Sequence, residues 1–288
     1  MELYKNDFMN KILILGASGL LGGSLVKYFL SKNFKVGALS RGHDKKKNEL
    51  VNTHTVNVLD YDNLESVIAQ YDIVINCIGQ VTSPMYDCIT LNSQGVKNII
   101  DAVKKNDNYL IHLSTVSVYG TSLYVTEDSP VNPESVYGTI KYFAEYQISQ
   151  GLTNFIILRV SNLYGEGQAK GILEYITRGF YSNERNLFFN NDGSLKRYYL
   201  HIDDLSAIVE MVLTNKLKGV YNIVGKDFLT IKQLIILCER VFNYSFNVKY
   251  ESKKPIENID KIDNSKFVEQ INYSFKNNIE VYLKGLSQ

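Results

Sequence analysis

Short, continuous runs of apolar residues recur along the first 165 residues and alternate with segments of helical periodicity. Apolar runs of about four to eight residues are typical of strands that are buried on both faces of a parallel sheet. We expect six such strands, at residues 11–15, 35–39, 56–59, 72–79, 110–114 and 155–158. Their alternation with helices predicts an α/β fold of the Rossmann type, with a doubly wound parallel sheet.

This alternation ends after Gly165. The later pattern predicts helices near 172–180, 230–241 and 277–284, a helix ending near Leu213, and a returning strand at 219–224. No low-complexity linker separates the two parts of the sequence. We therefore expect residues 1–165 to form an NADP-binding Rossmann domain to which residues 198–225 return. Residues 166–197 and 226–288 are expected to form a smaller substrate-binding part.

Composition narrows the class of protein. The chain has 288 residues, of which 45% are hydrophobic, an ordinary share for a globular protein. Its net charge of +1 gives no electrostatic basis for binding nucleic acid or a membrane surface. No apolar run approaches the roughly 20 residues that span a bilayer, and the first ten residues do not resemble a secretion signal. The three scattered cysteines fit neither a disulfide framework nor a metal site. The sequence predicts a cytoplasmic protein that binds no metal.

The first strand runs directly into a glycine-rich turn, Gly16-Ala-Ser-Gly-Leu-Leu-Gly22, and a helical pattern follows. In this context glycines allow a tight turn and let the backbone approach a pyrophosphate at the helix N-terminus. We expect the cofactor to be bound here by Gly16, Ser18, Gly19, Leu20, Leu21 and Gly22. The spacing is G-x-x-G-x-x-G rather than G-x-G-x-x-G, and the alternative is a turn that only packs the helix on the strand.

The second strand ends in Ser40 and Arg41, where NAD-preferring folds usually place a carboxylate for the adenosine ribose. A guanidinium suits a 2′-phosphate because it can donate two hydrogen bonds to it. We therefore predict NADP as the cofactor, with NAD as the alternative. Arg41 could instead be a residue of a solvated loop with no role in binding. Asp60 either accepts a hydrogen bond from the adenine amino group or acts only as a helix cap. Separately, Asp62 is expected to begin the next helix as its cap.

Tyr137 and Lys141 lie four residues apart in a helical pattern, so that both side chains share one face of the helix. An ammonium roughly 4 Å from a phenol, at an effective dielectric constant of about 20, contributes about 4 kcal/mol, or some three pKa units. Tyr137 would then be a usable proton donor or acceptor at a carbonyl or alcohol oxygen. The same spacing occurs at two other tyrosines, so the surroundings of Tyr137 decide its role.

Other polar residues are expected near the ends of strands. The strand at 110–114 delivers Ser114 and Thr115 at its carboxyl end, the edge at which open α/β sheets place their sites, although two hydroxyls there also fit an ordinary strand end. Asn92 is expected to open the helix at 93–105, either as its cap or as a contact of the site. The residues alone leave these alternatives open.

Five ordered motifs together resemble those of the extended short-chain dehydrogenase/reductase family, and more narrowly its nucleotide-sugar epimerases and reductases. The resemblance covers residues 11 to about 245. The motifs are the glycine turn, Ser114-Thr-Val-Ser-Val-Tyr-Gly120, Tyr137-Gly-Thr-Ile-Lys141, Arg159-Val-Ser-Asn-Leu-Tyr-Gly165 and the segment from Asn191 through Arg197 to Asp204. Five motifs in this order are far more specific than any one of them.

The resemblance implies an NAD(P)-dependent enzyme that acts on a nucleotide sugar. In the family's pattern Thr115 orients the substrate oxygen, and Tyr137 exchanges the proton. Lys141 assists Tyr137 and holds the nicotinamide ribose, and both Tyr137 and Lys141 are expected to contact the cofactor. Asn162 would contact the sugar nucleotide and Arg197 would hold its diphosphate, the alternative for Arg197 being a surface residue.

Two expectations concern the surroundings of the substrate. Phe188 or Phe189 either lies against the substrate base or packs in the core, and core packing is favoured. The chain is also compatible with a homodimer.

Departures from the family pattern narrow the reaction. Val116 and Ser117 stand where the family's dehydratases carry an Asp-Glu pair, and Ser117 also occupies the place of the cysteine found in the GDP-fucose synthase type. Neither dehydration nor cysteine-dependent epimerisation is therefore expected. A further departure lies in the last forty residues, which lack the usual Gly-Trp-x-Pro pattern because the chain has no tryptophan.

The sequence thus predicts NADPH-dependent reduction of a 4-keto (6-deoxy) nucleotide sugar in the synthesis of surface-polysaccharide precursors. An NAD(P)-dependent nucleotide-sugar 4-epimerase is the alternative, because Thr115, Tyr137 and Lys141 serve both reactions. A non-catalytic NADP(H)-sensing scaffold is a third hypothesis, against which the intact set of three residues argues.

Overall fold

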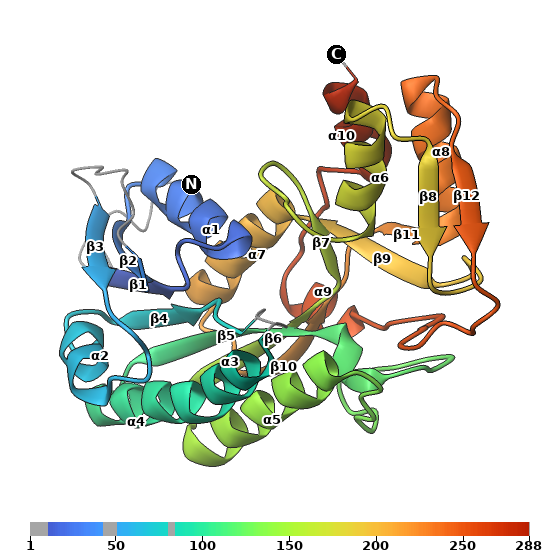
Figure 1. Cartoon of the computed structure of the whole chain (residues 1–288). Coiled ribbons are helices and arrows are strands. Elements are labelled where there is room, and N and C mark those ends of the chain that lie inside the picture. Colours follow the sequence, from blue (N-terminus) through green and yellow to red (C-terminus); the bar gives the residue numbers. More distant parts are fainter. Residues whose placement is uncertain (1–10, 43–50, 80–83, 288) are drawn as a thin grey trace. The chain divides into compact units, whose positions relative to one another are not determined.

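The computed structural model describes residues 11–42, 51–79 and 84–287 (Figure 1). Its internal contacts divide the chain into two compact units. Unit 1 comprises Met1–Leu113 with Phe143–Ile157, and unit 2 comprises Ser114–Tyr142 with Leu158–Gln288. Within the described ranges, no helix is long and apolar enough to cross a membrane.

A seven-stranded sheet is the central element, with the strand order β10-β6-β5-β4-β1-β2-β3 (Figure 1). Its strands are β1 (Lys11–Leu15), β2 (Lys35–Ser40), β3 (Val51–Thr55), β4 (Ile73–Asn76), β5 (Tyr109–Thr115), β6 (Phe155–Val160) and β10 (Gly219–Ile223). β1 pairs in parallel with β2 and β4, β2 with β3, and β4 with β5. The apolar run of β1 is fully buried from Ile12 to Leu15, as a strand covered on both faces requires. The predicted α/β, Rossmann-type fold class is confirmed.

The third strand lies earlier in the chain than expected. The prediction of a strand at 56–59 is wrong, because the strand is β3, whose pairing with β2 ends at Thr55 opposite Ser40. β3 is the edge strand, so it needs little apolar surface, and its sequence Val-Asn-Thr-His-Thr gives a weak hydrophobic signal. Val58 is buried, but it lies in the connection after the strand.

Helices of unit 1 follow its strands. They are α1 (Leu20–Ser31), α2 (Tyr61–Ile68), α3 (Met85–Thr90), the π-helical turn η1 (Leu91–Gly95) and α4 (Val96–Asn106). α5 (Val136–Gly151) begins in unit 2 and ends in unit 1. α2 and α4 pack together, and the side-chain amide of Asn98 on α4 donates to the carbonyl of Val58 at 2.9 Å.

Unit 2 contains two small sheets and five further α-helices. β7 (Asn162–Tyr164), β9 (Lys196–His201) and β11 (Asp227–Thr230) form one sheet in the order β11-β9-β7, and β8 (Asn186–Phe189) pairs with β12 (Asn247–Tyr250). The helices are α6 (Ile172–Tyr181), α7 (Ile202–Thr214), α8 (Ile231–Phe242), α9 (Ser265–Gln270) and α10 (Ile279–Leu286), with a 3₁₀ turn η2 (Val116–Tyr119). A buried apolar cluster that includes Ile176, Leu187, Leu234 and Leu283 joins α6, β8, α8 and α10.

The last forty residues are built into unit 2. Ser122 bridges to Ile259 and Val125 to Ile262, both in parallel. Asp204 at the start of α7 accepts hydrogen bonds from the backbone N–H groups of residues 276 and 277, at 3.0 and 3.1 Å. This segment carries little hydrophobic periodicity, and both polar contacts with distant residues and buried apolar side chains such as Ile259 and Leu283 hold it in place.

Candidate functional site

The glycine turn after β1 packs the start of α1 closely against the end of the strand. Gly16 has a φ of +80°, and its N–H and that of Ala17 both donate to the carbonyl of Leu39 at 3.0 and 3.1 Å. A Cβ on Gly22 would lie 2.3 Å from the carbonyl oxygen of Gly16, so only glycine fits there. The backbone of α1 at Gly22 therefore packs directly against the backbone at the end of β1.

The N-terminus of α1 carries no acidic group. Its N-cap, Gly19, has no side chain, and the first turn contains no acidic residue. The first helical hydrogen bond runs from Gly23 N–H to the Gly19 carbonyl at 2.8 Å. The preceding N–H groups of the first turn have no partner within an α-helix and favour an anion. The turn thus fits the pyrophosphate of a dinucleotide, and the contacts of Ser18, Leu20 and Leu21 with it stay predictions.

The end of β2 combines a fixed hydroxyl with an exposed cation. Ser40 is buried and its Oγ donates to the carbonyl of Gly42 at 2.7 Å. Arg41 is exposed to solvent. A contact of Arg41 with a 2′-phosphate remains a prediction, and the lysines at 45–47 lie outside the described residues.

Asp60 is the N-cap of α2. Its carboxylate accepts from the backbone N–H of Asn63 at 3.3 Å and from the side-chain amide of Asn63 at 2.6 Å. The capping alternative for Asp60 is therefore confirmed, and its contact with adenine stays a prediction. The expectation that Asp62 caps this helix is wrong, because Asp62 lies in the first turn, where its charge favours the helix dipole.

Asn92 does not open a helix. Its segment continues a helix that begins at Met85, and Asn92 itself lies in the π-helical turn η1. The side-chain amide donates to the carbonyls of Cys88 at 2.9 Å and Gly79 at 3.3 Å. The prediction of a cap is wrong because these contacts hold the amide inside a continuous helical run. A contact of Asn92 with the site stays a prediction.

Thr115 ends β5 and begins the 3₁₀ turn η2. It is buried, and its Oγ1 accepts from the backbone N–H of Ser117 at 3.2 Å. Gly138 on α5 has no side chain, and a Cβ there would lie 2.8 Å from the carbonyl oxygen of Ser117. The turn that follows Thr115 therefore packs directly against the turn of α5 that carries Tyr137.

α5 carries the predicted proton donor and lysine. Ser135 caps the helix, since its Oγ accepts from Gly138 N–H at 3.0 Å. Tyr137 is half-buried, and Lys141, one turn later, is only 2% exposed. Lysine is among the residue types least often fully buried, so its position here requires a polar role. Thr115, Tyr137 and Lys141 all belong to unit 2.

Arg197 lies on β9 and Asn162 on the neighbouring β7. Asn162 pairs with Tyr199, which is two residues, or about 7 Å, along the strand from Arg197. Nη1 of Arg197 donates to the carbonyls of Lys196 at 3.0 Å and Glu257 at 2.8 Å. Burial lowers the pKa of Arg197, and the nearby Glu257 and Tyr199 oppose that shift.

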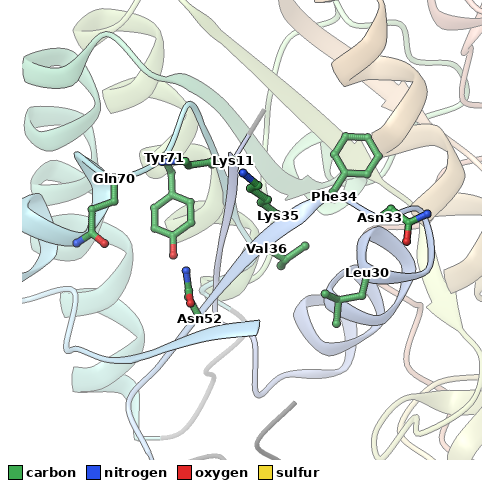
Figure 2. A pocket seen from close by; sticks show the side chains of 9 residues that line it. All are labelled: Lys11, Leu30, Asn33, Phe34, Lys35, Val36, Asn52, Gln70 and Tyr71. Carbon is green, nitrogen blue, oxygen red and sulfur yellow. The ribbon is translucent and has the colours of Figure 1, made fainter. Parts of the chain in front are cut away.

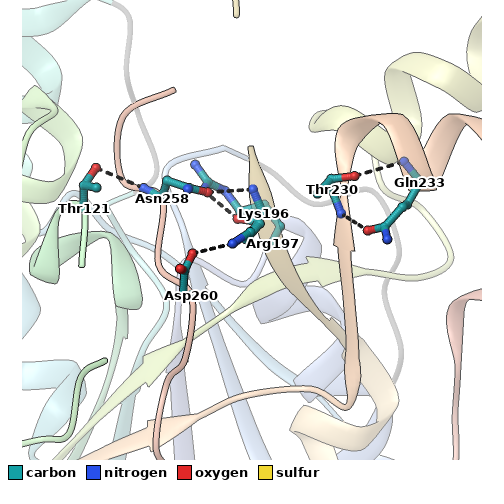
Figure 3. A network of polar contacts seen from close by, with 7 residues as sticks. All are labelled: Thr121, Lys196, Arg197, Thr230, Gln233, Asn258 and Asp260. Atoms are coloured by element: carbon teal, nitrogen blue, oxygen red, sulfur yellow. Dashed lines mark hydrogen bonds and ion pairs between the residues drawn. The ribbon is translucent and has the colours of Figure 1, made fainter. Parts of the chain in front are cut away.

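The remaining nitrogen atoms of the Arg197 guanidinium differ from Nη1 in their contacts. Within the described residues, Nη2 and Nε of Arg197 have no hydrogen-bond partner, so half of the guanidinium fork is fixed and half remains for a ligand. The preceding cation is engaged, because Lys196 Nζ donates to Asp260 at 2.6 Å (Figure 3). The surface-residue alternative for Arg197 does not fit a side chain this anchored.

The two phenylalanines of β8 differ. Phe189 is 8% exposed and belongs to the apolar cluster of unit 2, so core packing is confirmed for it. Phe188 is 61% exposed, and Lys249 Nζ lies 5.7 Å from its ring centroid. Core packing is wrong for Phe188, because neighbouring residues of a strand face opposite sides.

Two hollows in the described part of the chain include none of the residues predicted for catalysis, for cofactor binding or for the diphosphate. One, of about 370 Å³, lies where β1 and β2 begin, at the opposite end of β1 from the glycine turn (Figure 2). It is lined by Lys11, Leu30, Asn33, Phe34, Lys35, Val36, Asn52, Gln70 and Tyr71. The other, also of about 370 Å³, lies along α6 and β8 and includes Phe188.

Sequence reasoning missed the polar contacts made by residues 257–260. Asn258 accepts from the N–H of Lys196 at 2.8 Å and donates its own N–H to Thr121 Oγ1 at 3.2 Å (Figure 3). The sequence separations of 62 and 137 residues explain why no local pattern could reveal these contacts.

Comparison with protein-family models gives a match over residues 12–224, to the NAD-dependent epimerase/dehydratase family. This range includes every residue predicted for the site.

Curated relatives carry several activities in their names. The chain is 29% identical over 240 residues to a provisionally named UDP-glucose 4-epimerase of Methanocaldococcus jannaschii, covering 75% of this chain and 77% of that protein. It is 24% identical to methionine adenosyltransferase 2 subunit beta of Xenopus laevis, covering 81% and 72%. It is 29% identical to a dTDP-4-dehydrorhamnose reductase of Streptomyces griseus, covering only 54% and 50%.

Solved structures share the fold. The crystal structure of UDP-glucose 4-epimerase from Thermotoga maritima with UDP-glucose matches with a TM-score of 0.83, covering 95% of this chain and 96% of that one. At 22% identity this similarity supports the architecture alone.

Proposed function

Because the chain belongs to the NAD-dependent epimerase/dehydratase family, we propose that it transfers a hydride to C4 of a 4-keto nucleotide sugar. In this proposal NADPH is consumed and a sugar alcohol is released, as a precursor of surface polysaccharide. The observation that carries the proposal is Lys141, a nearly fully buried lysine one helical turn after Tyr137.

Proton transfer is assigned to Tyr137. Its hydroxyl gives a proton to the C4 oxygen as that carbonyl is reduced, so the ketone becomes an alcohol and the cofactor is oxidised. The ammonium of Lys141 favours the phenolate that remains. Thr115 supports the substrate oxygen from the turn that packs against α5 at Gly138. Bound NADPH supplies the hydride.

Arg197 is assigned to the diphosphate of the substrate. Its Nη1 is held by two backbone carbonyls, which orients the guanidinium plane before any ligand binds. Nη2 and Nε can then donate in parallel to one phosphate group. Asn162 on the neighbouring strand contributes an amide beside it. This arrangement supports a nucleoside diphosphate as the part of the substrate that is recognised.

The cofactor assignment rests on two features of unit 1. The glycine turn and the N-terminus of α1 suit the pyrophosphate, and Ser40 with Arg41 suits a 2′-phosphate better than a bare ribose hydroxyl. NADP in cells usually serves as a consumed reductant, which supports a reductase. The match to an NAD-dependent family keeps NAD as the alternative.

A nucleotide-sugar 4-epimerase is the second candidate. It is supported by the Methanocaldococcus relative, which aligns over three quarters of this chain, whereas the reductase relative aligns over about half. An epimerase must return the hydride to the opposite face of the same sugar, so it retains its cofactor through the cycle. A non-catalytic scaffold is the third candidate, since one relative is named as a subunit of another enzyme.

Stoichiometry separates these candidates. The purified protein is incubated with NADPH and a panel of UDP- and dTDP-linked 4-keto sugars while nicotinamide absorbance is followed. One NADPH oxidised per sugar converted is the expected result. Interconversion of a saturated nucleotide hexose without net cofactor consumption would establish the epimerase, and binding of NADPH without turnover of either kind would favour the scaffold.

A homodimer is proposed as well. α3 and the part of α5 that lies in unit 1 carry exposed apolar side chains, namely Met85, Tyr86, Ile89, Phe143 and Tyr146. These two segments belong to the same unit, and α5 packs on η1 through a hydrogen bond from Gln147 to the carbonyl of Asn92 at 3.1 Å. Burial of these side chains would stabilise association. Sedimentation at equilibrium tests for the dimer.

A further inference from the structure

Glu257 is held in an unusual backbone conformation. Its φ is +55°, in the left-handed region that disfavours residues with a Cβ and that glycine adopts without strain. Glutamate at such a position calls for a reason, and both its side chain and its backbone supply one. All of the contacts involved lie within unit 2.

The side chain of Glu257 reaches the first turn of α5. Ser135 Oγ donates a short hydrogen bond to Oε1 of Glu257, and the same Oγ accepts from the N–H of Gly138. A Cβ on Gly138 would lie 3.2 Å from that Oε1. The carboxylate therefore contacts the cap of the helix turn on which Tyr137 stands, and it lies where a side chain at Gly138 would have to fit.

The backbone of Glu257 reaches β9. Its carbonyl accepts from Nη1 of Arg197 at 2.8 Å, and its N–H donates to Oε2 of Glu134 at 2.5 Å. The next residue, Asn258, accepts from Lys196 N–H and so fixes this turn to the strand (Figure 3). One residue thus contacts both Arg197 and the turn of Tyr137.

We propose that Glu257 is a positioning residue that couples occupation of the diphosphate site at Arg197 to the placement of Tyr137. The inference rests on the proposed function for the roles of those two residues. When phosphate oxygens bind the free half of the Arg197 fork, the anchored guanidinium holds the Glu257 carbonyl in place, and with it the carboxylate that contacts Ser135 at the start of the helix turn.

The charge of Glu257 gives the proposal a distinctive signature. A carboxylate near an anion-binding arginine opposes binding of a diphosphate, so its removal leaves UDP affinity equal or higher. A general loss of structure would instead weaken binding and turnover together. The positioning role therefore predicts a fall in kcat without a rise in the dissociation constant of UDP.

Glu257→Gly is the informative variant. Glycine relieves the backbone conformation and keeps the carbonyl that binds Arg197, while it removes the side chain with its carboxylate. We expect kcat to fall about tenfold to a hundredfold, as for a misplaced catalytic group, with UDP binding unchanged or tighter. Glu257→Gln retains an acceptor for Ser135 and should recover most of kcat.

Lys216→Gly is the matched control, because Lys216 also has a left-handed φ, of 50°, but is exposed and lies at the end of α7. We expect this variant to keep both kcat and UDP affinity. Equal kcat in Glu257→Gly and the control, or loss of UDP affinity in Glu257→Gly together with kcat, would overturn the proposal.

Hydrogen exchange separates this proposal from the proposed function. UDP or dTDP is added to the full chain, and exchange of a peptide covering residues 134–142 is followed by mass spectrometry. We expect the nucleotide to slow exchange in the wild type and in Lys216→Gly, but not in Glu257→Gly. If this pattern appears in a protein that turns over no nucleotide sugar, the reaction assigned above is wrong and the coupling stands. If neither nucleotide changes exchange of this peptide in the wild type, the coupling is wrong.

Discussion

The glycine turn of unit 1 and the polar network of unit 2 are both predicted binding sites, but they are built in different ways. The turn uses the backbone groups of seven consecutive residues and the carbonyl of Leu39, and its shape depends on side chains that are absent at Gly16 and Gly22. The network uses side chains from distant parts of the sequence, such as Ser135 and Glu257, which are 122 residues apart. A backbone site therefore tolerates changes of most surrounding side chains, whereas the network depends on single functional groups.

The difference predicts opposite sensitivities. Adding a methyl group should disrupt the turn, and removing one polar atom should disable the network. The variants below test this contrast, and all but Arg41→Ala are compared with a control variant.

Tyr137→Phe should have the largest effect. It removes one hydroxyl and leaves the helix intact, and loss of a general acid lowers kcat by about 10² to 10⁴. Affinity for UDP should not change. Tyr146→Phe is the control, because Tyr146 lies on the same helix and is 54% exposed. Activity that survives Tyr137→Phe on a confirmed substrate would show that another group transfers the proton.

Gly22→Ala tests the backbone site. The new Cβ would lie 2.3 Å from the carbonyl oxygen of Gly16, so the turn must open. We expect a loss of about 1–3 kcal/mol in stability from overpacking. NADPH affinity should fall about a hundredfold, equivalent to two hydrogen bonds to a charged group at about 1.5 kcal/mol each.

Gly285→Ala is the control for this change. A Cβ at Gly285, in α10, meets nothing within 4 Å, and alanine is favoured over glycine in a helix by about 1 kcal/mol. This variant should be as stable as the wild type or slightly more so. NADPH affinity that is equal in both variants, measured by calorimetry, would contradict the backbone site.

These contrasts also explain how much could be predicted from the sequence. The glycine turn was predictable because its residues are contiguous and stand between a strand and a helix. The helix that carries Tyr137 and Lys141 was predictable from its periodicity. The edge strand β3 was misplaced because its polar sequence resembles a loop. The role of Asn92 in the π-helical turn η1 was missed because a helix interior and a helix cap can both accommodate asparagine.

The contacts of residues 257–260 could not have been predicted from periodicity. Their partners Thr121, Ser135 and Lys196 lie 60 or more residues away in the sequence. The left-handed φ of Glu257 could not be predicted either, because the residue that usually marks this conformation, glycine, does not stand there. Only the folded chain shows that the last forty residues support Arg197.

Arg197→Ala tests the ligand half of the network. Its free donors are expected to make charge-assisted hydrogen bonds to a phosphate, worth about 1.5–3 kcal/mol each. UDP affinity should fall about tenfold to a hundredfold with NADPH affinity unchanged. Lys196→Ala is the control, since that cation is already paired with Asp260. Equal losses in the two variants would mean that only the general positive charge matters.

Arg41→Ala tests whether a side chain contributes to the cofactor site. Because the turn supplies the main contacts, we expect NADPH affinity to fall only about tenfold, corresponding to about 1.4 kcal/mol, with NADH affinity unchanged. Calorimetric titration with both cofactors measures this. A wild-type preference for NADH that Arg41→Ala leaves unaltered would remove the argument for a 2′-phosphate.

Asp263→Asn should have the smallest effect. Hydrogen bonds from the Tyr124 hydroxyl and from Ser265 lower the pKa of Asp263 to about 2 and tie the last forty residues to the segment at 122–125. The folded-state pKa lies below the unfolded value of about 3.9, so the carboxylate stabilises the fold fully above about pH 4 and loses this contribution as the pH falls towards 2. The group is accessible to solvent, which limits the effect to about 1 kcal/mol or less. The difference in melting temperature between wild type and Asp263→Asn should therefore shrink from pH 6 to pH 3, whereas Glu269→Gln, an exposed carboxylate of α9, should show no such trend. A difference that is constant over this range would mean that the ionised carboxylate does not hold these two segments together.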